Sequence, residues 1–483
     1  MDFKGKKVTV MGLGLYENGS GIAATRFLVA AGAKVTVTDL KTAAQLAPQI
    51  KRLGALRRKI KLVLGEHREA DFKNADLILK NPGVPSTSKF LAIARENGVP
   101  IETDISLFFQ LIARKRIIGI TGTRGKSTTT TLIYDILRAT DKRAVLGGNI
   151  TSSPLAQMPA VKRGGPVVLE LSSWMLESLE PKKMSPYISV FTNVYPDHLN
   201  TYAGIKEYAA AKENIFRWQN AQDICVLNRD NKFTREMGGR VPAQRFRFSL
   251  KYFAEENGAF VRAGWIYFRR DGQEEKILAV KNLKVLGEHN RQNDLAAVAA
   301  AMAYGVPAGL VKKVAENFRG VPDRLELLRE VKGVKYYNDT TSTTPEATIA
   351  ALRALHSFCP TCRRGGDCRT VGGVGGSLKN IILIAGGADK GLDFKVLAKE
   401  IKKYCRAVIL LKGTGTDRLK LKIKNYELRI TECGSMADAV GVAQSLARKG
   451  EIVLLSPACA SFGMFVNEFD RGAQFRKAVG SLK

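Results

Sequence analysis

The residues best suited to chemistry lie at 118–131, in the stretch IGITGTRGKSTTTT. A β-branched strand leads there into a glycine-rich turn, which is followed by a lysine, a serine and a threonine-rich helix start. The backbone N–H groups of such a turn and the positive end of the helix together bind phosphate. We therefore predict that a nucleoside triphosphate binds to Gly122, Thr123, Arg124, Gly125, Lys126, Ser127 and Thr128.

Within this loop, Lys126 can reach the β- and γ-phosphates, and the hydroxyl of Ser127 or Thr128 can bind Mg²⁺. The pattern GxxxxGK[ST] is not fully met, because Ile120 stands where its first glycine belongs. The alternative is an ordinary turn between a strand and a helix, which the run Gly-Lys-Ser-Thr directly after a strand disfavours.

A second set of polar residues follows the next predicted strands. Glu170 ends the strand 166–171, and a carboxylate there is suited to Mg²⁺. His198 follows the strand 187–194 in the sequence NVYPDHLN, and it is one of only four histidines. Each has a plain alternative: a carboxylate that caps Ser172 or Ser173, and a surface histidine. Lys212 lies in the predicted helix EYAAAKENIF, where it reads as a solvated lysine.

Polar loops also follow strands in the last third of the chain. Asp339 follows the strand near 334–338, Lys390 follows the strand 380–385, and Ser461 follows the strand 451–456. Ligands of open α/β sheets bind at the carboxyl ends of the strands, so these loops predict a binding site. Helix capping is the alternative for Asp339 and Ser461, and Lys390 could bind an anionic carboxylate.

The N-terminal segment has the pattern of a nucleotide-binding βαβ unit. A strand near 6–11 precedes Gly12 and Gly14, a helix is predicted over about 20–31, and the second strand ends at Asp39. An acidic residue at that place can bind a ribose or a base. The fingerprint is imperfect, because Glu17 stands at the third glycine position, and a packing turn is the alternative.

The order of the elements predicts an α/β protein of three domains: 1–113, 114–320 and 321–483. The first and third are predicted to be Rossmann-like, and the central one to have a mainly parallel sheet around the phosphate loop. Between about 245 and 285, Asn257-Gly258 and Asp271-Gly272 separate short alternating strands, which predicts small antiparallel hairpins.

A cysteine-rich segment offers a separate set of metal ligands. His356, Cys359, Cys362 and Cys368 have the spacing H-x2-C-x2-C-x5-C, which supplies four ligands for structural Zn²⁺. The second pair lacks the spacing of a zinc finger, and an inert or disulfide-forming pair is the alternative. The segment 356–377 is glycine-rich and reads as a loop insertion.

Composition limits the class of protein. The 483 residues are 45% hydrophobic and 25% charged, as is usual for a soluble globular chain, and no apolar run is long enough to span a membrane. Seven cysteines, mostly scattered, and no leader-like apolar segment predict a cytoplasmic protein. The net charge of +31 favours polyanionic partners. The basic residues are dispersed, however, so we expect no specific nucleic-acid binding, and a basic nucleic-acid-binding P-loop protein is the alternative.

Several of these motifs occur together in one family. The stretches TGTRGKSTTT, LELSSWMLE, NVYPDHLNTY, GEHNRQN, GVPDRLE, AGGADKGLDF and SPACASFGMFVNEFDRG follow each other over nearly the whole chain. In this the sequence resembles the Mur ligases, and within them the enzymes that add D-glutamate to UDP-MurNAc-L-Ala in peptidoglycan precursor synthesis. The resemblance implies an ATP-dependent amide ligase that forms an acyl phosphate and acts as a monomer with ATP and two Mg²⁺ ions.

The resemblance also implies roles for single residues. Lys126 would hold the γ-phosphate, His198 would bind a second Mg²⁺, and Lys212 would be carbamylated beside that metal, in place of the solvated lysine. Further residues would bind the UDP-substrate (Gly14, Leu15, Asp39, Lys41, Asn149), ATP (Asn290, Asn293, Arg324, Asp339), D-glutamate (Thr343, Lys390, Ser461, Phe462) and the first Mg²⁺ (Ser127, Glu170).

One departure concerns the acceptor site. The family has a lysine in the sequence Asp-Ser-Lys-Ala-Thr, and this chain has Thr341 at that position. The uracil-side loop is also altered over residues 16–20. Another Mur ligase, or a ligase of the folylpolyglutamate synthase type with a different acceptor, is therefore the alternative within this class.

Overall fold

The structure is a computed structural model that describes residues 1–14, 19–150, 152–197, 201–285, 287–356 and 379–482. These residues form two compact units, which are described separately. The first unit comprises Met1–Asn282 and Gln292–Asn317, and the second comprises Leu283–Arg291 and Phe318–Lys483. The boundaries predicted at residues 113 and 320 stay predictions.

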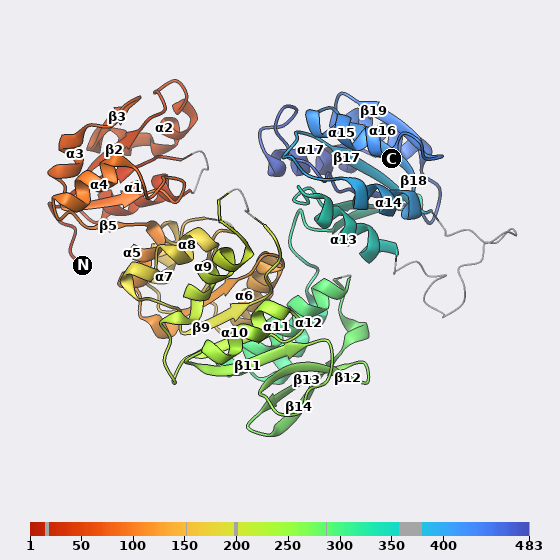
Figure 1. The fold of residues 1–483 in the computed structure, drawn as a ribbon, viewed down its shortest axis with the longest axis horizontal. Coiled ribbons are helices and arrows are strands. Elements are labelled where there is room, and N and C mark those ends of the chain that lie inside the picture. The colour runs from red at the N-terminus through yellow and green to blue at the C-terminus, as the bar shows by residue number, and fades with distance from the viewer. Residues whose placement is uncertain (15–18, 151, 198–200, 286, 357–378, 483) are drawn as a thin grey trace, which may run out of the picture. The chain divides into compact units, whose positions relative to one another are not determined.

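The first sheet is a parallel, Rossmann-like sheet with the strand order β3-β2-β1-β4-β5. Its strands are β1 (Lys7–Met11), β2 (Lys34–Asp39), β3 (Ile60–Leu64), β4 (Leu77–Lys80) and β5 (Ile101–Glu102). The helices along this segment are α1 (Ser20–Ala30), α2 (Ala47–Leu53), α3 (Glu69–Lys73), α4 (Lys89–Glu96) and α5 (Asp104–Leu111), as Figure 1 shows. The predicted Rossmann-like fold of this segment is confirmed.

The second sheet has nine strands in the order β14-β13-β12-β11-β10-β9-β6-β8-β7. Its strands are β6 (Ile117–Thr121), β7 (Val145–Gly148), β8 (Val167–Glu170), β9 (Ile188–Phe191), β10 (Ile224–Asn228), β11 (Gln244–Ser249), β12 (Gly258–Arg262), β13 (Trp265–Arg270) and β14 (Gln273–Ala279). Its helices are α6 (Lys126–Thr140), α7 (Met158–Val161), α8 (Ser173–Glu177), α9 (Ile205–Arg217), α10 (Lys232–Met237), α11 (Glu288–Tyr304) and α12 (Ala308–Asn317).

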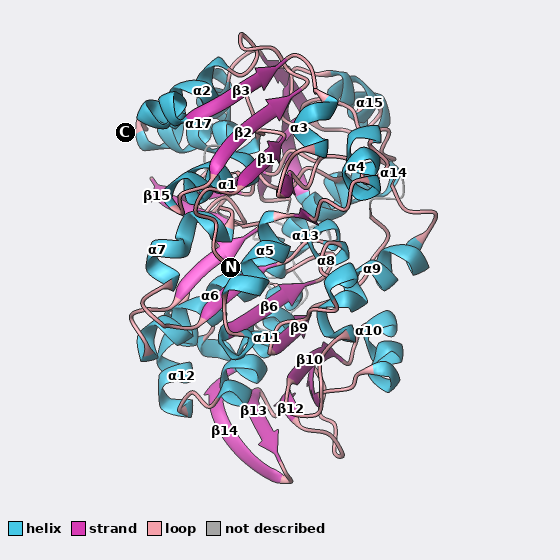
Figure 2. Cartoon of the chain, turned by 90° about the vertical axis from the view of Figure 1, so that its left-hand side faces the viewer, coloured by secondary structure: helices cyan, strands magenta, loops and turns pink. Residues whose placement is uncertain are grey.

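The last strands of this sheet confirm one predicted hairpin and correct the other. Strands β12, β13 and β14 are antiparallel and form one edge of the sheet (Figure 2). Asp271 and Gly272 connect β13 to β14 with φ of 50° and 80°, as an Asp-Gly hairpin turn requires. Asn257-Gly258 is not a hairpin turn, because β11 and β12 pair in parallel there. The other tight turn is Ala263-Gly264, whose φ angles are also positive.

The third sheet belongs to the second unit and has the order β15-β16-β20-β17-β18-β19. Its strands are β15 (Glu326–Val331), β16 (Val334–Asn338), β17 (Ile381–Gly386), β18 (Cys405–Leu411), β19 (Arg429–Cys433) and β20 (Ile452–Leu455). All its pairings are parallel except that of β15 with β16. The helices are α13 (Pro345–His356), α14 (Lys395–Tyr404), α15 (Thr414–Ile423), α16 (Met436–Leu446) and α17 (Glu468–Gly480).

The central strands of the third sheet are apolar along their whole length. Every residue of β17 and of β20 is buried, and the two strands pair directly. Helices on both faces of a parallel sheet exclude water from both sides of each strand, so the hydrophobic residues run without alternation. The carboxyl ends of these strands, where the backbone leaves the sheet, are the places left for polar groups.

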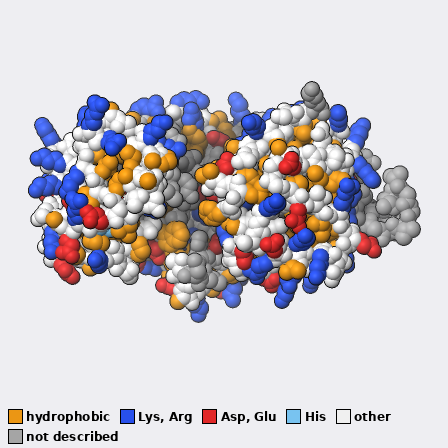
Figure 3. Space-filling model, turned by 90° about the horizontal axis from the view of Figure 1, so that it is seen from above, with side chains coloured by type: hydrophobic (Ala, Val, Ile, Leu, Met, Phe, Trp, Pro, Cys, Tyr) orange, Lys and Arg blue, Asp and Glu red, His pale blue; other side chains and the backbone are white. Residues whose placement is uncertain are grey.

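The surface matches the dispersed positive charge of the sequence. On the face shown in Figure 3, lysine and arginine side chains are spread out and do not gather in one patch. Among the described residues, no helix is both long and apolar enough to cross a membrane. The predicted cytoplasmic location stays a prediction.

Leu454 in β20 tests how much the core of the third sheet contributes to stability. Its side chain is 0% exposed, so Leu454→Ala leaves a cavity that the close-packed sheet cannot fill. We expect the free energy of unfolding to fall by about 2–5 kcal/mol in urea denaturation followed by circular dichroism. Val396→Ala is the control, because Val396 is 57% exposed and its loss should change stability little. Equal effects of the two substitutions would contradict the assignment of this core.

Candidate functional site

The predicted phosphate loop connects β6 to α6 and is held by residues that follow β9. Gly125 precedes the helix with a φ of 81°, and Gly122 has a φ of 147°. A Cβ atom at Gly122 would lie 1.9 Å from Thr192 Oγ1, so only glycine fits there. The Thr192 hydroxyl donates to the carbonyl of Arg124 (2.6 Å), and Asn193 Oδ1 accepts from the Arg124 N–H (2.9 Å). The loop is thus held in shape by contacts within the protein.

Lys126 lies folded across this loop. Its Nζ donates to the carbonyl oxygens of Gly122 (3.0 Å) and Thr123 (3.1 Å). These contacts keep the ammonium group at the mouth of the turn, where it can exchange a neutral carbonyl for a phosphate oxygen and form a stronger, charge-assisted bond. Ser127 and Thr128, the next residues, are both buried in the first turn of α6.

Glu170 is brought next to the loop by strand pairing. In the register of β6 with β8, Ile120 is opposite Glu170, so the carboxylate lies at the same edge of the sheet as the loop. Its Oε1 accepts from Asn149 Nδ2 at 2.8 Å, whereas Oε2 is buried and has no hydrogen-bond partner among the described residues. A buried carboxylate oxygen without a partner is costly unless a cation or a donor completes it.

These residues fit the Mg²⁺ ion that the family resemblance implies. Glu170 offers carboxylate oxygens, which Mg²⁺ prefers, and Ser127 offers a hydroxyl in the first turn of α6. His198, predicted as a second ligand, lies outside the described residues.

Lys212 is buried, and the interpretation as a solvated lysine is wrong. Its side chain on α9 is 1% exposed, with Nζ 4.6 Å from the centre of the Tyr208 ring. Burial, and then the nearby charge of Lys126, hold the pKa of Lys212 well below its usual value, although Asp197 and Glu170 act in the opposite direction. An amine in this position carries less positive charge at neutral pH and is therefore a better nucleophile.

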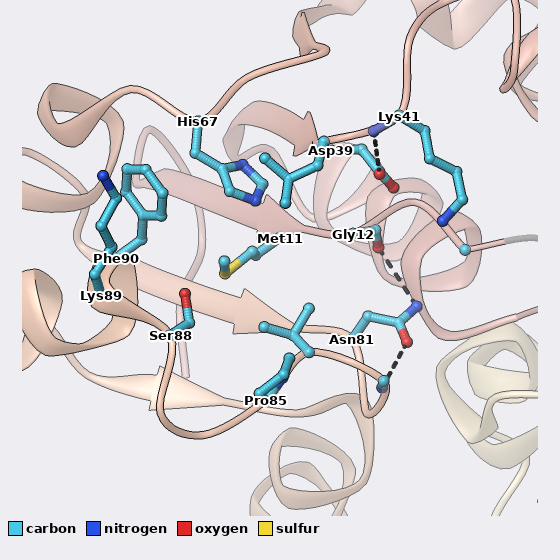
Figure 4. Close-up of a pocket in the computed structure, with 14 residues that line it drawn as sticks. Met11, Gly12, Asp39, Lys41, His67, Asn81, Pro85, Ser88, Lys89 and Phe90 are labelled. Atoms are coloured by element: carbon cyan, nitrogen blue, oxygen red, sulfur yellow. Dashed lines mark hydrogen bonds between the residues drawn. The ribbon is translucent and has the colours of Figure 1, made fainter.

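The predicted UDP-side residues line one cavity of 390 Å³ at the carboxyl end of the first sheet. Gly14, Asp39 and Lys41 are all part of its wall, and Figure 4 shows Asp39 and Lys41 there. The Asp39 carboxylate accepts from the backbone N–H groups of Leu13 (2.9 Å) and Lys41 (3.0 Å), so it also holds the glycine loop in place. Leu15 lies outside the described residues, and Asn149 is not part of this wall.

The predicted acceptor residues meet in the second unit, where three loops follow β16, β17 and β20. Lys390 Nζ donates to Thr343 Oγ1 at 3.2 Å. The Ala388 N–H donates to the Ala460 carbonyl at 2.9 Å, which brings Ser461 beside the Lys390 loop. Phe462, in contrast, is 64% exposed. Thr341 takes no cationic role, and its hydroxyl donates to the carbonyl of Asp323 at 3.0 Å.

Asp339 connects the loop after β16 to the loop after β20 and to the segment before β15. Its Oδ2 accepts from the hydroxyls of Ser342 (2.5 Å) and Ser456 (2.9 Å), and Oδ1 accepts from the N–H of Leu325 (3.0 Å). Burial raises the pKa of Asp339 to about 6, although these hydrogen bonds and the charge of Arg324 partly offset it. Asp339 and Arg324, both predicted to bind ATP, therefore lie close together.

The two asparagines predicted to bind ATP are both buried on α11 but fall into different units. Asn293, in the first unit, packs against the phosphate loop, because a Cβ on Gly125 would lie 2.1 Å from its Oδ1. Asn290 belongs to the second unit.

Arg471 is a site-organising residue that the sequence analysis missed. It is wholly buried on α17 and donates to Thr340 Oγ1 (3.0 Å), the Thr340 carbonyl (2.7 Å) and the Cys459 carbonyl (3.2 Å). It thereby joins the loop after β16 to the loop after β20. An arginine that directly follows an acidic residue in the helix start NEFDRG is expected to be exposed, so nothing in the local pattern indicated its burial.

The predicted zinc site has no support among the described residues. Cys359, Cys362 and Cys368 lie outside them, and His356 packs 4.5 Å from the Tyr404 ring. No group of three or more metal-binding side chains occurs in the part of the chain that the structure describes.

Comparison with known proteins agrees with this arrangement along the whole chain. Residues 6–103 match the model of the Mur ligase MurD-like N-terminal domain, 120–301 that of the Mur ligase middle domain, and 323–459 that of the Mur ligase glutamate ligase domain. A protein of Roseiflexus sp. (strain RS-1), named UDP-N-acetylmuramoylalanine–D-glutamate ligase, is 40% identical over 494 residues and covers 100% of both chains. The chain belongs to the Mur ligase family.

Other relatives agree. A protein of the same name from Koribacter versatilis is 38% identical over 482 residues, with 100% of this chain and 99% of the relative covered. Among solved structures, the UDP-N-acetylmuramate-alanine ligase MurC of Thermotoga maritima superposes with a TM-score of 0.60 at 20% identity, covering 99% of this chain and 100% of that one. The fold predicted for a Mur ligase is confirmed, and the chain is an ATP-dependent amide ligase, as Mur ligases are.

The raised pKa of Asp339 predicts a pH-dependent contribution to stability. A carboxyl whose pKa is higher in the folded state binds its proton more tightly there, so stability falls as the pH rises from about 4 to about 6. Asp339→Asn removes this titration. We expect the free energy of unfolding of the variant, relative to wild type, to increase by about 2 kcal/mol between pH 4 and pH 7. Urea denaturation across this range measures it, and a pH-independent difference would contradict the prediction.

Proposed function

We propose that this chain joins D-glutamate to UDP-MurNAc-L-Ala with the hydrolysis of ATP to ADP and phosphate, in the synthesis of peptidoglycan precursors. The observation that carries the proposal is the agreement with relatives of this name from the first residues to the last, at up to 40% identity. The geometry supports it, because some of the residues predicted for ATP, for Mg²⁺, for the UDP-substrate and for D-glutamate lie in a loop or pocket whose chemistry suits that ligand.

The chemistry follows from the weakness of a carboxylate as an electrophile. The γ-phosphoryl group of ATP is transferred to the terminal carboxylate of the substrate, and the resulting acyl phosphate carries phosphate as a leaving group. The amine of D-glutamate then attacks the carbonyl carbon, and the amide forms as phosphate leaves. Lys126 would stabilise the negative charge that moves between the phosphates and the acyl oxygen, which its position over the phosphate loop supports.

Mg²⁺ would be held by Ser127 and Glu170 at one site, and by His198 and modified Lys212 at the other. When bound, it screens the negative charge of the triphosphate and the carboxylate that must approach each other. Asn149 donates a hydrogen bond to Glu170 Oε1. The other carboxylate oxygen, Oε2, has no hydrogen-bond partner among the described residues and would bind the ion.

We assign Lys212 as a carbamate. Burial lowers the pKa of the Lys212 amine, so it gives up its proton more readily than an exposed lysine, and the lone pair of the neutral amine can attack CO₂ to form a carbamate with loss of one proton. The product is a buried anion, which is stable only with cations close by. Lys126 is one of these, and a metal ion would be another.

We assign the acceptor site to Thr343, Lys390, Ser461 and Phe462. With Thr341 in place of a lysine, Lys390 would be the cation of this site, which its hydrogen bond to Thr343 supports. D-glutamate carries two carboxylates, so a cation beside two hydroxyl groups suits one of them.

The proposed reaction predicts the result of an assay with alternative amino acids. With ATP, Mg²⁺ and UDP-MurNAc-L-Ala, we expect phosphate release that depends on D-glutamate, together with a product heavier by one glutamyl residue in mass spectrometry. Lys126→Ala is the control and should turn over at the background rate. Release with L-lysine or meso-diaminopimelate but not with D-glutamate would overturn the assignment of the acceptor.

The carbamate predicts a dependence on CO₂. We expect Lys212→Ala to lower kcat by roughly a hundredfold or more, because a fixed anion of the site is lost. Lys206→Ala is the matched control, since Lys206 lies exposed on the same helix and should leave kcat unchanged. Wild-type protein given ¹³C-bicarbonate should show a carbamate signal by ¹³C NMR that Lys212→Ala lacks. Normal turnover of Lys212→Ala, or the same signal in both proteins, would show that the assignment is wrong.

A further inference from the structure

The cavity of the first sheet has a second end that none of the predicted residues occupies. Gly12, Asp39, Lys41 and Asn81 form a polar end beside the glycine loop, and His67 and Phe90 lie toward the other (Figure 4). The His67 ring packs edge-on against Phe90, with 5.0 Å between ring centres. This aromatic end has the shape and chemistry for a flat heterocycle with one polar edge.

His67 is fixed in the cavity wall by one hydrogen bond. Its Nδ1 lies 2.7 Å from Thr38 Oγ1, and the same hydroxyl lies 3.1 Å from the carbonyl oxygen of Glu66. A carbonyl oxygen can only accept, so the single hydroxyl proton of Thr38 goes to Glu66. Thr38 then accepts from His67, which places the ring proton on Nδ1.

The other nitrogen of the ring is therefore a hydrogen-bond acceptor. A neutral imidazole carries one N–H, so with the proton on Nδ1 the lone pair of Nε2 is available. Burial lowers the pKa of His67, and the charge of Asp39 offsets this only in part, so the ring is neutral near pH 8. The wall of the cavity thus presents a fixed acceptor beside an aromatic surface.

We propose that His67 Nε2 accepts a hydrogen bond from the N3–H of the uracil ring, and that His67 determines the base specificity of the UDP-substrate pocket. This rests on the proposed function, which supplies a uridine nucleotide as substrate. Uracil carries a proton on N3, whereas N3 of cytosine carries only a lone pair. A cytosine in the same place would set two acceptors against each other, and the buried acceptor would lose its partner.

Asp39 is less suited to this discrimination. Both of its carboxylate oxygens already accept from backbone N–H groups, those of Leu13 and Lys41. These bonds shape the loop, so Asp39 acts on the pocket through the position of its wall. The ring nitrogen of His67 has no such competing bond among the described residues.

The test compares three ligands on two proteins by isothermal titration calorimetry at pH 8. The ligands are UDP, CDP and UDP methylated at N3, and the proteins are wild type and His67→Phe. Phenylalanine keeps the flat ring against Phe90 and removes the acceptor. For wild type, we expect UDP to bind roughly 10- to 100-fold more tightly than CDP or N3-methyl-UDP. For His67→Phe, we expect the three affinities to agree within about threefold.

The wild-type series remains informative if the variant does not fold, which the thermal midpoint of His67→Phe would reveal. Equal affinity of wild type for UDP and N3-methyl-UDP, or no binding of UDP, would overturn the proposal. So would a preference of His67→Phe for UDP over CDP as strong as that of wild type.

Ligase activity separates this proposal from the proposed function. If wild type joins D-glutamate to UDP-MurNAc-L-Ala with an unchanged KM in His67→Phe, the function stands and His67 is not the base-reading residue. If the proposal is right, KM for the UDP-substrate should rise roughly 10-fold or more in His67→Phe, while kcat stays near the wild-type value. Lys51→Met is the control, because Lys51 is exposed on α2 and does not line the cavity.

Discussion

The parallel pairing of β6 with β8 and β9 is the constraint on which the central site depends. Because the three strands are parallel, their carboxyl ends all lie at the same edge of the sheet, so polar groups from distant segments lie side by side there. Glu170 is placed opposite Ile120 by this register, and Thr192 follows the strand that flanks β6 on the other side. A one-residue slip of β8 would turn Glu170 away from the loop, because successive side chains alternate between faces.

The second theme is the burial of groups that carry charge in water. Lys212, Asp339 and Arg471 are all at most 6% exposed, and each has its pKa displaced toward the neutral form. Groups of this kind weaken a fold unless hydrogen bonds or opposite charges surround them. In this chain each one lies where loops from different strands must be held or where an anionic ligand is expected, which is a physical reason to keep them despite the cost.

The fold was predictable to a large extent because its signals are local. Glycine positions, runs of β-branched residues and helix starts located the first two strands, the helix between them and the phosphate loop. The sequence-based predictions were wrong where the conformation of a turn depends on how the flanking strands pair. Asn257-Gly258 has the sequence of a hairpin turn, but the strand before it pairs in parallel with the strand after it. Ala263, which has no particular preference for positive φ, makes a tight turn because the pairing of β12 with β13 requires one.

The sequence by itself determined the phosphate loop and the polar residues that follow the strands near it. A glycine that needs positive φ, a lysine after it and a carboxylate at a strand end depend on neighbours within a few positions. Only the tertiary structure decided that Lys212 is buried, that Lys390 contacts Thr343 and that His67 Nδ1 lies beside the Thr38 hydroxyl. These facts depend on contacts between segments 29 to 47 residues apart, or on packing from all sides. Burial and proton position follow from the arrangement of the whole unit, which no local pattern contains.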